Sequence, residues 1–404
     1  MTSLIELDPA PMSRLSRKSR VENAGVRDEP PPRLRSLYAM AYGSILLPAW
    51  QGVVRKRPFV SKRWLLARTQ WMPRDARDEV QLKALRSLLM HAGQNVPYWR
   101  ELFRKVGFDP RQVRTLSDLG ALPVLSRDIV AERMNDLIDP AHRGTNICKG
   151  TSGTSGKPLQ FENCSRSEAW RQAVRLRGYG WGGYRVGMPT LHYWGAGDAM
   201  PDGLAGHRVR LDRALRREVY VDATKQDDAS LRETADLIVA MRPHAIVAYT
   251  QALASFARWV DAQGRRDWPD MRVICCAQGL TARDRSVLER TFGPDVYETY
   301  GTRETMLIAA ECEAHAGMHL SEENVIVEVM HGGRPADPGV AGDVLVTDLH
   351  NYGMPFIRYV NGDVAAMAHD GVCPCGRTLR KLARVEGRRK STKRRPSVVE
   401  THGN

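Results

Sequence analysis

Hydrophobic and polar positions along the middle of the chain predict strands and helices in alternation. Short apolar runs typical of buried strands occur at residues 189–197, 245–249 and 273–277. Stretches with helical spacing of apolar positions lie around them, at residues 167–177, 230–241, 251–263 and 282–292. Strands that alternate with helices of about a dozen residues favour an α/β fold, with mostly parallel sheets flanked by helices.

The patterns on either side of this region differ. Between residues 78 and 103, apolar residues recur at helical spacing and predict one helix with a buried face, which ends near residues 95–100. From His319 onward, strand-like segments separated by Gly and Pro predict a smaller β-rich sub-lobe at residues 319–386. Residues 36–386 are therefore expected to form the folded core domain.

Both ends of the chain are polar and show no period of a helix or strand. Residues 1–35 contain several prolines and are expected to be a disordered arm. Their basic residues are interleaved with Glu22, Asp28 and Glu29, which argues against a nucleic-acid-binding arm. Residues 387–404 form a tail dense in Arg and Lys.

An apolar run at residues 37–54 approaches the length that spans a bilayer. Gly43, Pro48, Gln51 and Gly52 interrupt this run, so it predicts no transmembrane span. We interpret it as a helix that packs on the core domain, with weak contact to a membrane surface as the alternative.

Composition limits the compartment and the kind of partner. The 404 residues are 42% hydrophobic, and the mean hydropathy of −0.41 is typical of a soluble chain with a large core. A net charge of +14 suits anionic ligands such as nucleotides, acidic membrane surfaces or nucleic acid, without choosing among them. Seven scattered cysteines and a start without a signal peptide favour the cytoplasm, with thiols free or bound to metal.

Residues 150–158 form the most distinctive stretch, with three glycines, four hydroxyl residues and Lys157 between two predicted strands. Backbone N–H groups and hydroxyls in such a loop can surround a polyphosphate, with the lysine as a point charge. Thr151 and Pro158 occupy positions where a Walker A loop requires Gly and Ser or Thr, so the loop is of another kind. A flexible hairpin without a ligand is the alternative.

Two further stretches follow in the sequence. Residues 296–304 predict a strand that ends at Tyr300 and Gly301 and then a turn that presents Glu304, an oxygen ligand suited to Mg²⁺. Residues 356–364 predict an apolar strand and a glycine turn before Asp363, whose carboxylate could accept bonds from two vicinal hydroxyls. Taken alone, residues 296–304 are also compatible with a solvated turn at the end of a strand, and residues 356–364 with an ordinary hairpin.

The glycine-rich loop, Tyr300-Gly301-x-x-Glu304 and Arg358-Tyr359-x-x-Gly362-Asp363 together resemble the motifs of the adenylate-forming superfamily of AMP-forming acyl and aryl ligases, in that family's order. The resemblance covers about residues 36–388. Residues 95–100 and 122–126 resemble the opening of phenylacetate–CoA ligase-like proteins, and are most similar to the branch associated with capsular polysaccharide genes.

This resemblance implies roles for the matching residues. The aromatic Tyr300 would stack on the adenine of ATP beside Gly301, Thr302 would lie near the α-phosphate, Glu304 would hold Mg²⁺, and Asp363 would bind the ribose. The loop would bind phosphate through these residues: Thr151, Ser152, Gly153, Thr154, Ser155 and Gly156. Lys157, the lysine of the loop, would be catalytic.

The same resemblance implies that strand-to-helix turns line the pocket of a carboxylic acid substrate: Trp194, Tyr249, Gln278 and Gly279. The aromatic rings suit an aromatic or other apolar acid, although core packing also explains them. Family members often carry a glutamate at the position of Gln278, so this chain departs from the pattern there.

Cysteine and histidine residues gather in two later stretches, and soft ligands of this kind can build a tetrahedral Zn²⁺ site. The predicted ligands are Cys312, His315, Cys373 and Cys375, with His319 as the alternative to His315. Some phenylacetate–CoA ligase-like proteins are similar here and carry a structural zinc. Unrelated free thiols are the other interpretation, and the remaining cysteines are expected to be small core residues: Cys148, Cys164, Cys275 and Cys276.

The expected chemistry is attack by a carboxylate on the α-phosphorus of ATP, which releases pyrophosphate and gives acyl-AMP. In the family, the pair at Gly387-Arg388 opens a hinge to a mobile C-terminal lobe, which helps transfer the acyl group to a thiol such as CoA or a carrier protein. Here basic residues follow and the sequence ends at Asn404, so we expect ATP to bind, acyl-AMP to form slowly and no detectable thioester with CoA. The alternatives are a silent nucleotide-binding protein, a half-enzyme completed by a partner, and a tail that binds nucleic acid or acidic surfaces.

Overall fold

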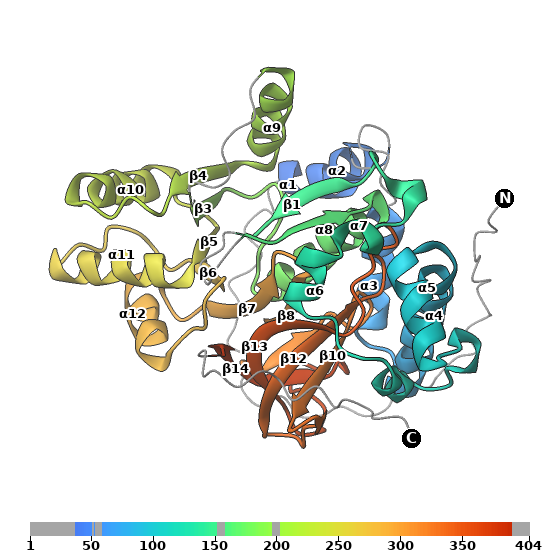
Figure 1. Ribbon diagram of the computed structural model, residues 1–404. Coiled ribbons are helices and arrows are strands. Elements are labelled where there is room, and N and C mark those ends of the chain that lie inside the picture. The colour runs from blue at the N-terminus through green and yellow to red at the C-terminus, as the bar shows by residue number, and fades with distance from the viewer. Residues whose placement is uncertain (1–36, 51, 53–58, 152–157, 196–202, 390–404) are drawn as a thin grey trace, which may run out of the picture.

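The computed structural model describes residues 37–50, 52, 59–151, 158–195 and 203–389, and a twelve-stranded sheet runs through it (Figure 1). The strand order is β11-β10-β12-β13-β14-β9-β8-β7-β6-β5-β3-β4. The predicted arm at residues 1–35, residues 152–157 of the glycine-rich loop and residues 390–404 of the tail lie outside the described residues.

One part of the sheet is parallel. It contains β3 (Thr190–Trp194), β4 (Glu218–Asp222), β5 (Ala245–Tyr249), β6 (Arg272–Cys276) and β7 (Val296–Thr302). Helices α10 (Asp228–Met241), α11 (Thr250–Ala262) and α12 (Ala282–Phe292) connect these strands and cover one face (Figure 1). Helix α8 (Ser165–Trp181) packs on the other face.

The strands of this part are buried on both faces, as in other parallel sheets. In β5, Ile246 and Ala248 face the core beneath α10–α12, whereas Val247 faces the cluster that includes Trp170 of α8. In β6, Val273 and Ile274 divide between the same two clusters. Continuous apolar runs at these positions in the sequence therefore correspond to strands covered by helices on each side.

The rest of the sheet is antiparallel. Its strands are β8 (Met306–Glu311), β9 (Met318–Leu320), β10 (Val325–His331), β11 (Arg334–Pro335), β12 (Ala341–Asp348), β13 (Tyr359–Met367) and β14 (Lys381–Arg388). The sheet continues from β7 through β8 into this region, where the smaller β-rich sub-lobe was predicted. The α/β fold class with a large sheet flanked by helices is confirmed.

The N-terminal region is helical. It contains α1 (Leu37–Ala41), the π-helical η1 (Tyr42–Leu46), α2 (Leu47–Ala49), α3 (Phe59–Thr69), α4 (Arg74–Asn95) and α5 (Pro97–Val106). The prediction of one helix over residues 78–103 was wrong. Val96 is extended and Pro97 opens a second helix, because a proline at the first helical position needs no partner for its missing N–H.

Shorter elements complete the described part of the chain. They are α6 (Arg127–Glu132), α7 (Met134–Leu137), the 3-10 helices η3 (Pro110–Gln112), η4 (Leu116–Ala121) and η5 (Pro140–His142), the hairpin β1 (Ile147–Gly150) and β2 (Gln160–Asn163), and α9 (Gly203–Arg216). Helix α9 projects from the body of the molecule (Figure 1). In the described residues, no helix is both long and apolar enough to cross a bilayer.

Strand β14 corrects one predicted boundary. Gly387 pairs with Val364 and Arg388 pairs with Asp363 at the edge of β13, so both residues belong to the sheet. The tail had been predicted to begin at residue 387. The end of β14 could not be recognised from an alternation of apolar and polar residues. Its last residue, Arg388, is polar and pairs with the polar Asp363 of β13.

Candidate active site

Hairpin β1–β2 holds the base of the glycine-rich loop. Gly150 pairs with Gln160 in this hairpin. One residue further on, the Thr151 N–H donates to the Leu159 backbone oxygen at 2.9 Å. The Leu159 N–H donates to Thr151 Oγ1, also at 2.9 Å. Residues 152–157 connect these strands but lie outside the described residues, so the roles of Ser152, Gly153, Thr154, Ser155, Gly156 and Lys157 stay predictions.

The predicted pocket and nucleotide residues lie where the parallel strands end. Trp194 closes β3, Tyr249 closes β5, Gln278 and Gly279 follow β6, and Tyr300 lies near the end of β7. In open α/β sheets, ligands bind outside the carboxyl ends of the strands. The topology therefore collects on one sheet edge residues that are more than a hundred positions apart in the sequence.

Gly301 illustrates why a glycine occupies the end of β7. A Cβ atom at this position would lie 2.1 Å from the Met306 carbonyl oxygen, inside the tight turn from β7 to β8. The turn places the Thr302 hydroxyl 3.0 Å from the Thr305 hydroxyl, and the Thr305 N–H donates to Thr302 Oγ1 at 3.2 Å. Any larger residue than glycine would force this turn apart.

Glu304 is part of this turn, and its side chain is buried. Its carboxylate has few neighbours that could form a hydrogen bond or an ion pair. The Tyr359 hydroxyl donates to Glu304 Oε1 at 3.1 Å, while Arg127 Nη1 is 3.7 Å from the same oxygen. Arg171 fixes the turn from behind, since its Nη1 donates to the Glu304 backbone oxygen at 2.6 Å. A buried carboxylate with spare lone pairs suits a bound cation.

Arg127 connects Glu304 to the glycine-rich loop. Its Nη2 donates to Thr151 Oγ1 at 3.0 Å, and its Nη1 faces Glu304. Arg303 makes a second connection, from its Nη1 to the Gly150 backbone oxygen at 3.2 Å. Two residues of the predicted nucleotide site that lie 153 positions apart, Thr151 and Glu304, are thus held on either side of one guanidinium.

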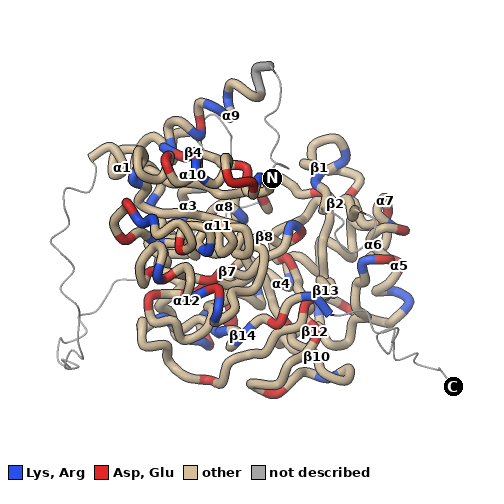
Figure 2. Tube along the Cα trace, turned by 90° about the vertical axis from the view of Figure 1, so that its left-hand side faces the viewer, with Lys and Arg blue, Asp and Glu red and all other residues tan. Residues whose placement is uncertain are grey.

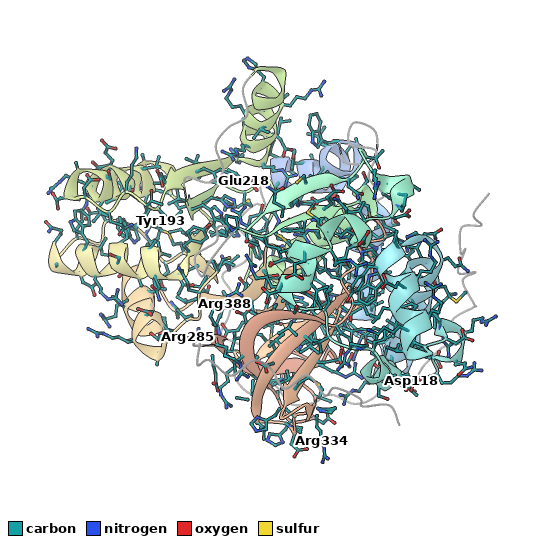
Figure 3. The ribbon with its side chains drawn as sticks, viewed as in Figure 1. Asp118, Tyr193, Glu218, Arg285, Arg334 and Arg388 are labelled. Atoms are coloured by element: carbon teal, nitrogen blue, oxygen red, sulfur yellow. The ribbon has the colours of Figure 1, made fainter. Side chains whose placement is uncertain are left out.

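Asp363 lies in a second polar cluster. Its Oδ2 accepts from the Tyr300 hydroxyl at 2.8 Å, and its Oδ1 is 3.2 Å from Arg388 Nε. Asn361 Nδ2 donates to the Tyr300 oxygen at 2.7 Å, and Asn361 Oδ1 accepts from the Asp363 N–H at 3.0 Å. Arg388, labelled in Figure 3, is the last residue of β14 and lies opposite Asp363 of β13.

Burial dominates the electrostatics of this cluster. Loss of solvent raises the pKa of the Asp363 carboxyl above its usual range, although Arg388 and the Tyr300 hydrogen bond act in the opposite direction. The pKa of the Tyr300 hydroxyl is raised far above its usual range by burial and by the adjacent Asp363. Tyr300 is therefore a neutral donor, and Asp363 is a desolvated acceptor.

The predicted acid pocket is built from strand ends that are fixed by hydrogen bonds. The Trp194 and Tyr249 rings lie 4.3 Å apart, and Gly195 makes room for them, because a Cβ there would be 2.9 Å from the Tyr249 ring. The Thr250 hydroxyl donates to the Gln278 backbone oxygen at 2.8 Å, which joins the turns after β5 and β6. The Gln278 side chain is exposed and accepts weakly from the Gln251 N–H at 3.4 Å.

The turn after β6 also contains strained backbone. Ala277 has a φ of 73°, which is uncommon for a residue other than glycine. Such strain costs energy and is found most often at ligand sites. Gly279 follows beside β14, since a Cβ there would lie 3.8 Å from the Val385 oxygen.

A cysteine and histidine cluster lies away from these strand ends. The ligand atoms of Cys312, His319, Cys373 and Cys375 all lie within 4.8 Å of one another. His315, which the sequence favoured, is not among them. It has a left-handed backbone with a φ of 48°, stacks on Tyr297 and lies 3.5 Å from Glu311.

The orientation of His319 suits metal binding. Its Nδ1 lies 3.3 Å from the Leu379 backbone oxygen, which can only accept, so Nδ1 carries the hydrogen and Nε2 has a free lone pair. Nε2 lies 3.3 Å from Cys375 Sγ. Burial lowers the pKa of His319 to about 4, which keeps the imidazole neutral. Among the other cysteines, Cys148 is exposed, contrary to the prediction, whereas Cys164, Cys275 and Cys276 are buried.

Sequence reasoning missed several residues of the site. Tyr359 and Asn361 lie inside the motif at residues 356–364, but their hydrogen bonds to Glu304 and Tyr300 depend on the fold. Arg127 directly follows the stretch at residues 122–126, and no feature of its own marked it. Arg171 is buried in α8, and no sequence signal distinguishes it from the other charged residues of that helix.

Comparison with known proteins is consistent with this geometry. No model of a known protein family matches the sequence. The chain is 26% identical over 326 residues to a phenylacetate–coenzyme A ligase of Thermus thermophilus, which covers 78% of this chain and 71% of that protein. It is 25% identical over 329 residues to a phenylacetate–coenzyme A ligase of Escherichia coli, with the same two coverages.

Solved structures agree with the fold. A crystal structure of 2-hydroxyisobutyryl-CoA ligase in the postadenylation state superposes with a TM-score of 0.67 at 19% identity, over 80% of this chain and 70% of that one. Several phenylacetate–coenzyme A ligases match in sequence, and in this chain Tyr300 and Asp363 of two predicted motifs are hydrogen-bonded to each other. The chain is therefore similar in sequence to AMP-forming ligases of the phenylacetate–CoA ligase-like kind, and it has the fold of such ligases.

Proposed function

We propose that this protein activates a carboxylic acid with ATP by forming acyl-AMP and pyrophosphate. The observation that carries the proposal is the position of Arg127, which hydrogen-bonds Thr151 at the base of the glycine-rich loop and faces the buried Glu304. A phosphate-binding loop and a metal-binding carboxylate must lie side by side for the α-phosphate to be attacked. Catalysis of this kind is mostly positioning and neutralisation of charge.

Asp363 would bind the ribose of the nucleotide. A carboxylate has about four lone pairs, and the bonds from Tyr300 and Arg388 leave acceptor capacity on both oxygens. Tyr300 would orient the carboxylate through its hydroxyl and stack its ring on the adenine. Each hydrogen bond to a charged group of this kind contributes about 1.5–3 kcal/mol.

Glu304 would hold Mg²⁺, whose preferred ligands are oxygen atoms. Its carboxylate fits this role because it is buried and the nearest guanidinium nitrogen is 3.7 Å away, beyond hydrogen-bond distance. Bound Mg²⁺ would neutralise charge on the phosphates. Arg127 would then position the loop through Thr151, and Thr302 would present its hydroxyl toward the α-phosphate.

The substrate is proposed to be an aromatic or other apolar acid held near Trp194 and Tyr249. Two rings 4.3 Å apart at the strand ends, beside the strained turn at Ala277, support this choice. The relatives that match in sequence are named for phenylacetate and coenzyme A, and coenzyme A is therefore the thiol acceptor to test.

We also propose a structural Zn²⁺ held by Cys312, His319, Cys373 and Cys375. Three thiols and one neutral imidazole within 4.8 Å are a ligand set suited to zinc, and four protein ligands leave no position open for catalysis. The ligands come from the residue after β8, from β9 and from the loop before β14. The metal would tie these three segments together.

Exchange of labelled pyrophosphate into ATP tests the proposed function, with benzoate, phenylacetate and aliphatic acids as the panel. We expect exchange that depends on an aromatic acid and on Mg²⁺, and that falls about 10²- to 10³-fold in Glu304→Gln. Glu233→Gln, which changes an exposed glutamate of α10, is the control and should retain exchange. ATP binding without exchange for any acid would instead support a silent nucleotide-binding protein.

A further inference from the structure

The N-terminal helical run has an apolar face that is exposed. Elements α1, η1 and α2 follow one another without a break over residues 37–49. Tyr42 and Leu47 on one side are buried in the core that also contains Trp170. Three large side chains on the opposite side are 51 to 75% exposed: Leu37, Met40 and Ile45. Their spacing of three and five positions, across the π-helical turn, keeps them on one stripe.

Helix α3, which is hydrogen-bonded to η1, carries a second pair of exposed apolar side chains. Val60 and Trp64, four positions apart and so on one side of the helix, are 37% and 69% exposed. Arg63 Nη1 donates to the Gly43 backbone oxygen at 2.7 Å, which holds α3 against η1. We call the exposed set the N-terminal apolar face: Leu37, Met40, Ile45, Leu46, Val60 and Trp64.

The stretch of sequence that carries this face is basic. Helix α3 contains Lys62, Arg63 and Arg68 and no acidic residue. Over residues 30–74 the sequence has nine lysines and arginines and no aspartate or glutamate. In the rest of the described chain, basic and acidic residues are interspersed (Figure 2). An apolar stripe with a tryptophan, on a stretch of sequence whose charged residues are all basic, is typical of a helix that lies in a membrane interface.

We propose that the N-terminal apolar face docks the protein on a membrane surface that contains anionic phospholipids. Insertion of the apolar side chains removes them from water, and the cations remain at the level of the lipid phosphates. A second copy of the chain fits less well, because the same cations would be brought against each other. This inference does not rest on the proposed acid activation, since it involves none of the active-site residues.

Vesicle co-sedimentation of the full 404-residue chain tests the proposal. We expect binding to phosphatidylcholine vesicles that contain about one third phosphatidylserine, little binding to phosphatidylcholine alone, and weaker binding as salt is raised. The variant Ile45→Ser/Trp64→Ser should bind anionic vesicles at least about tenfold more weakly. Both side chains are mainly exposed, so the variant should melt as the wild type does.

The control variant is Val340→Ser/Val372→Ser, which removes two valines that are 40% and 77% exposed in the antiparallel part. It should bind as the wild type does. Equal vesicle binding by the wild type and Ile45→Ser/Trp64→Ser would overturn the proposal, as would equal binding to neutral and anionic vesicles. So would self-association in solution that the double variant abolishes, since the face would then join two copies.

Discussion

The Tyr300 hydroxyl donates to the Asp363 carboxylate at 2.8 Å, and this bond joins the last parallel strand, β7, to the antiparallel strand β13. The two residues belong to different sequence motifs, 63 positions apart. Their contact means that the residue proposed to bind ribose and the residue proposed to lie beside adenine form one unit. A change in either should therefore affect nucleotide binding through the other.

The first prediction concerns the affinity of this unit for ATP. Asp363→Ala should weaken nucleotide binding by about 1.5–3 kcal/mol, because it removes hydrogen bonds to a charged acceptor. Asp343→Asn is the matched control. Asp343 lies on the adjacent strand β12, opposite Val364, and pairs with Arg389 on the surface. Calorimetry should show a loss in the first variant alone, and unchanged affinity in Asp363→Ala would falsify the ribose assignment.

The second prediction follows from the raised pKa of Asp363. An acid whose pKa is higher in the folded than in the unfolded state lowers stability as pH rises from its ordinary pKa to the raised one. Asp363→Asn keeps the shape and removes this charge. The variant should be at least as stable as the wild type at neutral pH, and the difference should shrink as pH falls into the ordinary carboxyl range. Urea unfolding at a series of pH values measures it, and a variant clearly less stable at neutral pH would refute the electrostatic argument.

Local periodicity explains which parts of the fold could be predicted. Residues 245–249 and 282–292 were predicted with the bounds of β5 and α12, because the first is a continuous apolar run and the second has its apolar residues at helical spacing. Pro97 was misread because a proline can end one helix or begin the next, and only the path of the chain decides. The site motifs were found because each is local in sequence.

The missed parts of the site depend on contacts between distant segments. Arg127 bonds Thr151 at a separation of 24 positions and faces Glu304 on another element, and no local pattern encodes this. His315 and His319 are equally placed in the sequence to join Cys312. The left-handed backbone at His315 turns it toward Glu311, while β9 directs His319 to the cysteines.

The third prediction tests Arg127. Arg127→Ala should slow pyrophosphate release about 10- to 100-fold, because the base of the loop would lose its link to the Glu304 region and the reacting groups would be misplaced. ATP affinity should change much less. Arg133→Ala serves as the control, since Arg133 caps the end of α6 and pairs with Asp136 and Glu101 on the surface. Equal losses in both variants would show that Arg127 acts only through stability.

The fourth prediction concerns zinc. Protein purified without chelator should contain about one Zn²⁺ per chain, as a closed site with four protein ligands requires. His319→Ala and Cys375→Ser should lose the metal and melt at lower temperature. His315→Ala and Cys148→Ser should keep it, since neither residue is in the cluster. Zinc retained in His319→Ala but lost in His315→Ala would reverse the assignment, and metal-free protein of full stability would exclude it.

The central claim is that a carboxylate oxygen of the substrate attacks the α-phosphorus of ATP. Oxygen-18 placed in the carboxyl group of an acid that supports pyrophosphate exchange follows that oxygen directly. When the acyl group is then transferred to water, hydroxylamine or coenzyme A, the bridging oxygen should remain on the phosphate. We predict AMP that carries one labelled oxygen, detected by mass spectrometry, in the wild type, and strongly reduced product in Glu304→Gln. Unlabelled AMP, or ADP in place of AMP, would contradict the account.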